Sequence, residues 1–247
     1  MQTNRVRIHV LIETGGSYDS GFSNLSLPHP CLRELHLSVR ELSTEQLKSF
    51  LPGLRSVQAL TIRVCQPLHS YVLRDIGEHC PNLTYLSFRA AHEFDDSDIS
   101  SFVQHCTAIK RLQLRSISGS QLTDRSLLAV AACCSSLERL DLLGWSFDRG
   151  VHITEYGLLH LIHRCTNIKR LRLACADISL SALEHMGEVC TALRALDIKS
   201  DISDEGLRVI AQGFPNLKKF SLSSRMASEF RLFEMRPGIW QYHSFCF

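Results

Sequence analysis

The sequence lacks the features that mark membrane, secreted and highly charged proteins. No stretch approaches the roughly 18 consecutive apolar residues needed to span a bilayer. Residues 1–10 contain Arg5 and Arg7, where a secretory signal has an uninterrupted apolar run. The formal net charge is only +2, so the chain as a whole is neither strongly basic nor strongly acidic. We therefore expect a soluble protein of the cytoplasm or nucleus that makes no membrane contact.

Catalytic and metal-binding motifs are also missing. The sequence contains no G-x-S-x-G, P-loop, H-E-x-x-H or dinucleotide-binding fingerprint. Its 10 cysteines include no C-x-x-C pair that could help to close a tetrahedral zinc site. The sequence therefore predicts neither an enzyme nor a bound metal or cofactor.

What the sequence does contain is a repeat, whose clearest copy runs from Cys165 to Leu173 as C-x-x-I-x-x-L-x-L. Apolar residues recur three, six and eight positions after the cysteine in further copies that begin at Cys80, Cys106, Cys134 and Cys190. Degenerate copies begin at Leu54 and Phe214, and one without a leading cysteine contains Leu32, Leu35 and Leu37. The copies recur roughly every 24–31 residues, which is close to the period of leucine-rich repeats.

The segment before each cysteine has the periodicity of a helix. Leu158, Leu161, Ile162 and Cys165 stand at i, i+3, i+4 and i+7, which places them on one helical face, and the other copies share this spacing. A Ser or Thr such as Ser203 stands one turn ahead of the first buried Leu, where its hydroxyl can cap the helix for about 1 kcal/mol. Each repeat is therefore predicted to be a helix, a turn and a short strand.

These repeats resemble the cysteine-containing leucine-rich repeats of the F-box/leucine-rich repeat protein family, over about Leu32 to Leu222. The resemblance implies an α/β solenoid, a right-handed β-α superhelix in the form of a horseshoe with a parallel concave sheet and outer helices. It also implies a protein-interaction module, similar to the substrate-recognition part of an SCF-type E3 ubiquitin ligase receptor. Because one repeat type serves many partners, a stand-alone scaffold or inhibitor and a receptor for an acidic or polyphosphate ligand remain alternatives.

Members of that family carry an F-box before the repeats, and it binds the adaptor of the ligase. Here the first repeat-like strand is expected over residues 5–12, and no proline-led, leucine-rich helical triplet precedes it. We therefore expect either a truncated form or partner contacts that differ from those of the family. Adaptor binding is expected only if an F-box is encoded upstream.

The chain is expected to form one continuous domain with irregular ends. Residues 1–31, with the turn-like segment 15–21, are an irregular N-terminal repeat or cap, and residues 32–223 form the cysteine-containing repeat domain. Residues 224–247 are a non-repeat tail, or a cap whose aromatic side chains close the core.

The repeated cysteines are expected to be structural. Cysteines of adjacent repeats would lie about 5 Å apart, a distance that does not forbid a disulfide. However, buried thiols behave as small hydrophobic groups, and the cytosol keeps them reduced. The repeat position also explains the recurring pairs His79-Cys80 and His105-Cys106 without a metal.

The residues that face outward between the core leucines are mostly basic, while acidic residues are common in the helices. This basic stripe would attract an acidic or phosphorylated protein substrate. It lacks interleaved aromatic residues, which argues against nucleic acid. An alternative is that the stripe is only a solvated face, because long basic side chains cover strands well. Five of its arginines lie on three successive predicted strands, with only Asp141 to offset their mutual repulsion: Arg111, Arg115, Arg139, Arg170 and Arg172. The residues predicted to bind the partner are Arg89, Arg111, Arg115, Arg139, Asp141, Arg170, Arg172 and Lys199.

Two repeats are longer than the others, with extra residues at 115–121 and 143–152 that should form one rim. Insertions of this kind tend to mark the binding side, and Trp and Arg are favoured interface anchors. The alternative is that the aromatic residues fold back over the edge of the solenoid. We expect a monomer within its complexes, with a second set of partner-binding residues formed by Trp145, Phe147, Asp148 and Arg149.

Overall fold

The computed structural model describes residues 6–12, 31–39, 42–68, 71–91, 93–116, 120–142, 152–175, 178–223 and 240–242. The strands of the main sheet are β1 (Val6–Ile12), β2 (Leu32–Val39), β3 (Ala59–Val64), β4 (Tyr85–Ala90), β6 (Arg111–Ser116), β8 (Arg139–Asp141), β9 (Arg170–Ala174), β10 (Ala195–Lys199), β11 (Lys219–Ser223) and β12 (Trp240–Tyr242). Two short strands, β5 (Phe94–Asp95) and β7 (Ser120–Gln121), pair with each other. The helices are α2 (Thr44–Phe50), α3 (Val72–His79), α4 (Asp96–His105), α5 (Asp124–Cys133), α6 (Glu155–Arg164), α7 (Leu180–Val189), α8 (Asp204–Gly213) and the 3-10 turn η1 (Leu51–Leu54).

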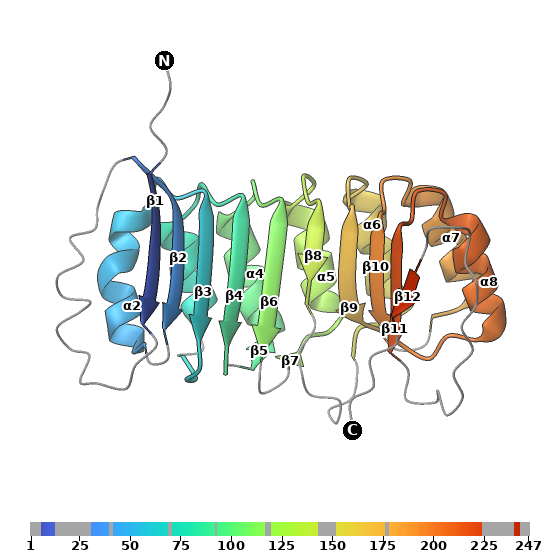
Figure 1. The fold of residues 1–247 in the computed structure, drawn as a ribbon, viewed down its shortest axis with the longest axis horizontal. Helices are drawn as coiled ribbons and strands as arrows, with labels where there is room; N and C mark the ends of the chain where they lie inside the picture. The colour runs from blue at the N-terminus through green and yellow to red at the C-terminus, as the bar shows by residue number, and fades with distance from the viewer. Residues whose placement is uncertain are drawn as a thin grey trace, which may run out of the picture.

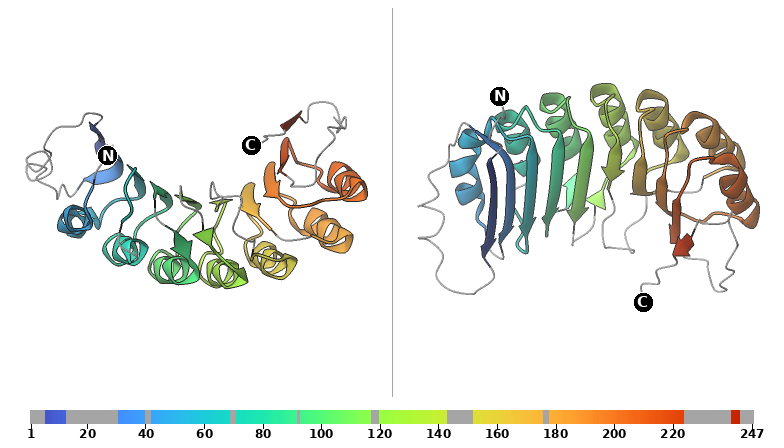
Figure 2. Two further views of the ribbon diagram at one scale, coloured as in Figure 1. Left: turned by 90° about the horizontal axis from the view of Figure 1, so that it is seen from below. Right: turned by 45° about the horizontal axis from the view of Figure 1, so that its top comes forward.

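The described strands form one 10-stranded sheet in which neighbours follow the order of the chain (Figure 1). Every pairing is parallel. The register places equivalent buried leucines beside one another on neighbouring strands, and the successive partners are Leu86, Leu112, Leu140, Leu171 and Leu196. Seen along the strands, the sheet lines the inside of an arc and the helices lie outside (Figure 2). The chain is therefore an α/β leucine-rich repeat solenoid, as the repeat predicted.

Both ends of the described chain add a strand to this sheet. β1 pairs with β2, which agrees with the strand predicted over residues 5–12, and β12 pairs with β11. The domain boundaries at residues 31 and 223 remain predictions, because much of both end segments lies outside the described residues. Within the described part of the chain, no helix is long and apolar enough to cross a membrane.

The predicted helix caps are confirmed. The hydroxyls of Ser43, Thr123, Thr154, Ser179 and Ser203 each accept a hydrogen bond from a backbone N–H in the first turn of the helix that follows. Asp95 performs the same role for α4 with its carboxylate. Because these groups satisfy N–H donors that a helix start leaves open, each repeat begins its helix at a defined residue.

A carboxylate ladder, formed by Asp96, Asp124 and Glu155, links successive caps. Asp96, the first residue of α4, accepts hydrogen bonds from the backbone N–H (2.9 Å) and hydroxyl (2.6 Å) of Thr123 in the next repeat. Asp124 does the same for Thr154, with both distances 2.7 Å. Glu155 then accepts from the backbone N–H of Ser179 at 2.9 Å. Each residue of the ladder thus fixes the start of the following helix.

The ladder requires a close approach between α5 and α6. A Cβ atom on Gly157 would lie 2.9 Å from Cγ and 3.0 Å from Cα of Asp124, so only glycine fits without displacing that residue. Gly157 therefore serves the Asp124–Thr154 contact directly.

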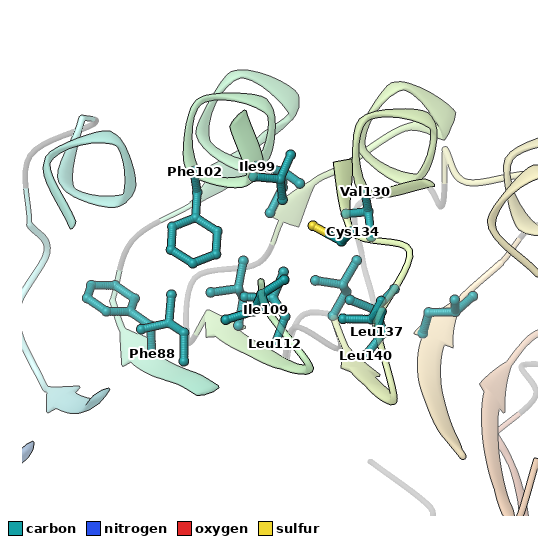
Figure 3. Packing of buried hydrophobic residues seen from close by; sticks show 14 of the residues in the cluster. Phe88, Ile99, Phe102, Ile109, Leu112, Val130, Cys134, Leu137 and Leu140 are labelled. Carbon is teal, nitrogen blue, oxygen red and sulfur yellow. The ribbon is translucent and has the colours of Figure 1, made fainter. Parts of the chain in front are cut away.

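The repeated cysteines are buried at the ends of the helices. Cys80, Cys106, Cys134, Cys165 and Cys190 each form the C-terminal cap of a helix. The thiols of Cys106 and Cys165 donate to the backbone carbonyl of the preceding repeat's cysteine, at 3.4 and 3.3 Å. Burial raises the pKa of Cys134 to about 12. Figure 3 shows Cys134 packed between Val130 and Leu137. Such thiols are protonated and act as packing groups.

We predict that Gly157→Ala destabilises the fold by about 1–3 kcal/mol, because it displaces Asp124 and breaks its hydrogen bonds to Thr154. Denaturant unfolding followed by circular dichroism measures the change. Gly213→Ala is the control: nothing lies within 4 Å of its Cβ, so this variant should be unchanged or slightly more stable. Equal losses in both variants would contradict the role of Gly157.

A second prediction concerns acid stability. Burial alone would raise the pKa of Asp96, but the hydrogen bonds from Ser126 and Thr123 outweigh it and lower that pKa. The stabilisation is therefore complete above the unfolded-state pKa of about 4 and is lost as the pH falls through the lower folded-state pKa. Thermal unfolding across this range should show a smaller loss of stability in Asp96→Asn than in the wild-type chain. Parallel pH profiles would exclude Asp96 as a source of the acid sensitivity.

Candidate functional site

The register arranges the outward-facing residues of the concave sheet in three rows that cross the strands. The first row, at the strand starts, contains Ala59, Tyr85, Arg111, Arg139, Arg170, Ala195 and Lys219. The middle row contains Thr61, Ser87, Gln113, Asp141, Arg172, Asp197 and Ser221. The last row contains Arg63, Arg89 and Arg115, then Ala174 and Lys199. The predicted concave residues therefore share one face but belong to different rows.

Asp141 lies at the centre of this face and is 0% exposed. Its Oδ2 atom is 2.9 Å from Nη2 of Arg115 and 3.8 Å from Nη1 of Arg172. Asp197 on the next strand adds a second carboxylate, with Oδ2 2.5 Å from Nε of Arg172. The expectation that Asp141 alone offsets the five arginines is therefore wrong, because Asp197 also compensates Arg172.

The other three arginines are in a different electrostatic situation. We call Arg111, Arg139 and Arg170, which are successive partners on β6, β8 and β9, the arginine row. In the part of the chain that the structure describes, no carboxylate forms an ion pair with any of them. Of the five arginines on β6, β8 and β9, the three without an ion-pair partner among the described residues therefore stand in a single row.

Neutral groups hold two members of the arginine row in place. With the Gln113 amide turned so that its oxygen faces Arg139, the orientation that the surrounding donors favour, this oxygen accepts hydrogen bonds from Nη2 and Nε of Arg139 at 2.7 and 2.8 Å. The guanidinium group of Arg111 lies over the ring of Tyr85, 4.8 Å from its centre. Both contacts orient a cation without adding a negative charge to it.

The arginine row carries an electrostatic cost in the free protein. Burial, with the nearby guanidinium group of Arg170 adding to it, lowers the pKa of Arg139. Neighbouring strands lie about 4.8 Å apart, well within the Debye length of about 8 Å at physiological salt. An anion placed on the row would therefore relieve repulsion as well as form new contacts.

Of the remaining predicted residues, the structure describes two, and both stand outside the arginine row. Arg89 and Lys199 are half-buried in the last row, on β4 and β10. Trp145, Phe147, Asp148 and Arg149 fall outside the described residues, so the insertion rim remains a prediction.

Sequence reasoning missed Gln113 and Tyr85 as parts of this surface, because both are uncharged. Their positions between the core leucines of the repeat were the available signal. Each stands at the same outward place in its strand as a residue that was selected.

A solenoid of this kind, with a broad concave sheet open on one side, defines the class: the chain is a leucine-rich repeat protein-interaction module. No family model matches the chain. Among curated proteins, it is similar to Coronatine-insensitive protein homolog 2 of rice, in both Oryza sativa subsp. indica and subsp. japonica. The identity is 28% over 247 residues, which cover 91% of this chain and 34% of the relative. The chain thus spans about a third of the length of these relatives.

Two solved structures also superpose on the chain. The leucine-rich repeat-containing protein LegL7 from Legionella pneumophila has a TM-score of 0.40 and 14% identity, covering 79% of this chain and 75% of its own. A chain of the Rad7 and Elc1 complex in yeast has a TM-score of 0.39 and 13% identity, covering 87% of this chain and 81% of its own.

We predict that Asp141→Asn costs about 1–3 kcal/mol of stability, because it leaves Arg115 and Arg172 less compensated around a buried position. Asp197→Asn is the matched control, since Asp197 is more exposed and pairs with Arg172 alone, so its cost should stay below about 1 kcal/mol. Urea unfolding of both variants measures the difference. A loss for Asp197→Asn as large as that for Asp141→Asn would contradict the central position given to Asp141.

Proposed function

We propose that the concave face of this module recognises a protein substrate that carries an acidic or phosphorylated segment. In this proposal the module is the substrate-recognition part of an SCF-type E3 ubiquitin ligase receptor. The chain itself performs no catalysis, and its partners carry out ubiquitin transfer in the cytoplasm or nucleus. Contact with the ligase adaptor would be made by an F-box encoded upstream of the repeats.

The observation that carries this proposal is the arginine row. Guanidinium groups bind carboxylates and phosphates through two parallel hydrogen bonds, and such charge-assisted bonds are stronger than neutral ones. Among the residues that the structure describes, Arg115 and Arg172 have carboxylate ion-pair partners, whereas Arg111, Arg139 and Arg170 do not. A row of cations without an ion-pair partner among the described residues is suited to a partner that supplies negative charge.

Two further points support the link to ubiquitin ligation. The cysteine-containing repeats resemble those of F-box/leucine-rich repeat proteins, and the chain is similar to a part of the rice coronatine-insensitive homologues. The alternative is a stand-alone scaffold or inhibitor, which would use the same face without any ligase. Capture experiments with the tagged chain, extended upstream to include any F-box, separate the two. Recovery of the F-box-binding adaptor together with the substrate supports the ligase role, and recovery of the substrate alone supports the scaffold.

We predict that Arg139→Glu combined with Arg170→Glu abolishes capture of the protein substrate while the fold survives. The control combines Arg125→Glu with Arg164→Glu, two exposed helix residues, because it changes the net charge equally. Mass spectrometry of captured proteins, with circular dichroism as the folding check, measures the result. Capture by the wild-type chain should also fall steeply as salt is raised.

Two results would contradict this proposal. In one, the Arg139→Glu/Arg170→Glu variant captures the same proteins as the control. In the other, capture does not respond to salt and is instead destroyed by Trp145→Ala, which would place recognition on the insertion rim.

A further inference from the structure

The direction of the arginine row limits what kind of partner can use it. Along β9, the next outward residue after Arg170 is Arg172, which is already paired with Asp141 and Asp197. Along β6, Arg111 is followed by Gln113 and then by Arg115, which is paired with Asp141. A partner segment lying along a strand would therefore meet one available cation and then a compensated pair. A segment lying across the strands meets three available cations in succession.

The spacing of the row distinguishes between the possible shapes of such a segment. Successive partners on parallel strands are about 4.8 Å apart, which places the three arginines at about 0, 4.8 and 9.6 Å. Residues i, i+4 and i+7 of an α-helix share one face and rise to about 0, 6 and 10.5 Å. An extended segment presents same-side residues about 6.7 Å apart, so its third residue lies about 13 Å from the first. The helix therefore keeps all three acidic groups close to their arginines, whereas the extended segment misplaces the third.

The surroundings of the row also suit a helix. The outward neighbours of the row are Tyr85 beside Arg111 and Ala195 beside Arg170, one aromatic and one small, and neither is charged. β6 and β9 have six and five residues, which gives a face about 17–20 Å long at these two strands, and β8 between them has three residues, about 10 Å. A helix about 10–12 Å in diameter fits across the three strands. The sheet curves along the same direction, so a short straight helix would lie as a chord across the floor of the arc (Figure 2).

From these observations we infer that the partner segment is an α-helix with an acidic stripe at i, i+4 and i+7, lying across β6, β8 and β9. This inference rests on the proposed function, in that the concave face must bind a protein. It adds the shape and orientation of the segment and the residue contacts. The first, second and third acidic residues contact successive members of the arginine row, in one of the two possible directions.

Two fluorescent peptides of identical composition test this inference. Both are alanine- and glutamine-based helices with three glutamates. One carries them at i, i+4 and i+7, and the other at i, i+5 and i+6, which spreads them around the helix. Circular dichroism confirms equal helix content, and fluorescence anisotropy at low salt measures binding to the intact chain. The striped peptide should bind roughly tenfold tighter, because it makes two more charge pairs than the other.

Charge exchange tests the contact at the middle of the row. A striped peptide whose central glutamate is replaced by lysine should bind Arg139→Glu more tightly than it binds the wild-type chain. The Arg125→Glu/Arg164→Glu variant should bind the original striped peptide as well as the wild-type chain does.

The outcomes separate this inference from the proposed function. Equal binding of the two peptides, with loss of both in Arg139→Glu/Arg170→Glu, would overturn the helical stripe and leave recognition by the arginine row intact. Tighter binding of a proline-containing extended peptide with glutamate at alternate positions would overturn the helix in the same way. Failure of every peptide to bind would also reject the helical stripe, whereas the proposed function depends on the capture experiment with whole proteins.

Discussion

The in-register parallel pairing of short strands is the constraint on which the rest of this structure depends. Each strand is paired with the equivalent strand of the next repeat, so Leu112, Leu140 and Leu171 lie at one level of the core. Since side chains alternate along a strand, the residues directly before these leucines point to the opposite face and are aligned there with one another. The arginine row is therefore a consequence of the same register that builds the core. A shift of one residue in any pairing would disrupt both faces together.

The repeats are joined on their helical side by a different kind of contact. Asp96, Asp124 and Glu155 each bind the cap of the following repeat, which couples the start of one helix to the start of the next. The ladder is not continued at α7, because this helix begins with Leu180, a residue that is 41% exposed. The repeats on either side of this point are joined instead by the pairing of β10 with β11 and by the hydrogen bond from the Asn216 side chain to the backbone carbonyl of Thr191.

Much of this architecture could be predicted, because the repeated spacing of apolar residues and cysteines specifies which residues face the core. The helix caps and the basic concave face followed from the same pattern. The charge balance of that face could not be predicted, since Asp197 and Arg172 meet only through the geometry of two adjacent strands. The carboxylate ladder was also missed: an acidic residue at a helix start is expected from the helix dipole alone, so its contact with the next repeat leaves no separate signal. The bond between Gln113 and Arg139 was hidden because a neutral side chain does not stand out among arginines.

The carboxylate ladder also determines how a protein of this kind can change in length. A duplicated or exchanged repeat keeps this contact where a first-turn carboxylate, such as that of Asp124, still meets a hydroxyl cap, such as that of Thr154, and a small residue such as Gly157 gives it room. Each added repeat would extend every concave row by one residue and leave the existing contacts unchanged. The charged surface therefore lengthens in steps of one repeat. Duplication within the ladder offers a route to larger partners in which the new junction can reuse the carboxylate-to-cap contact.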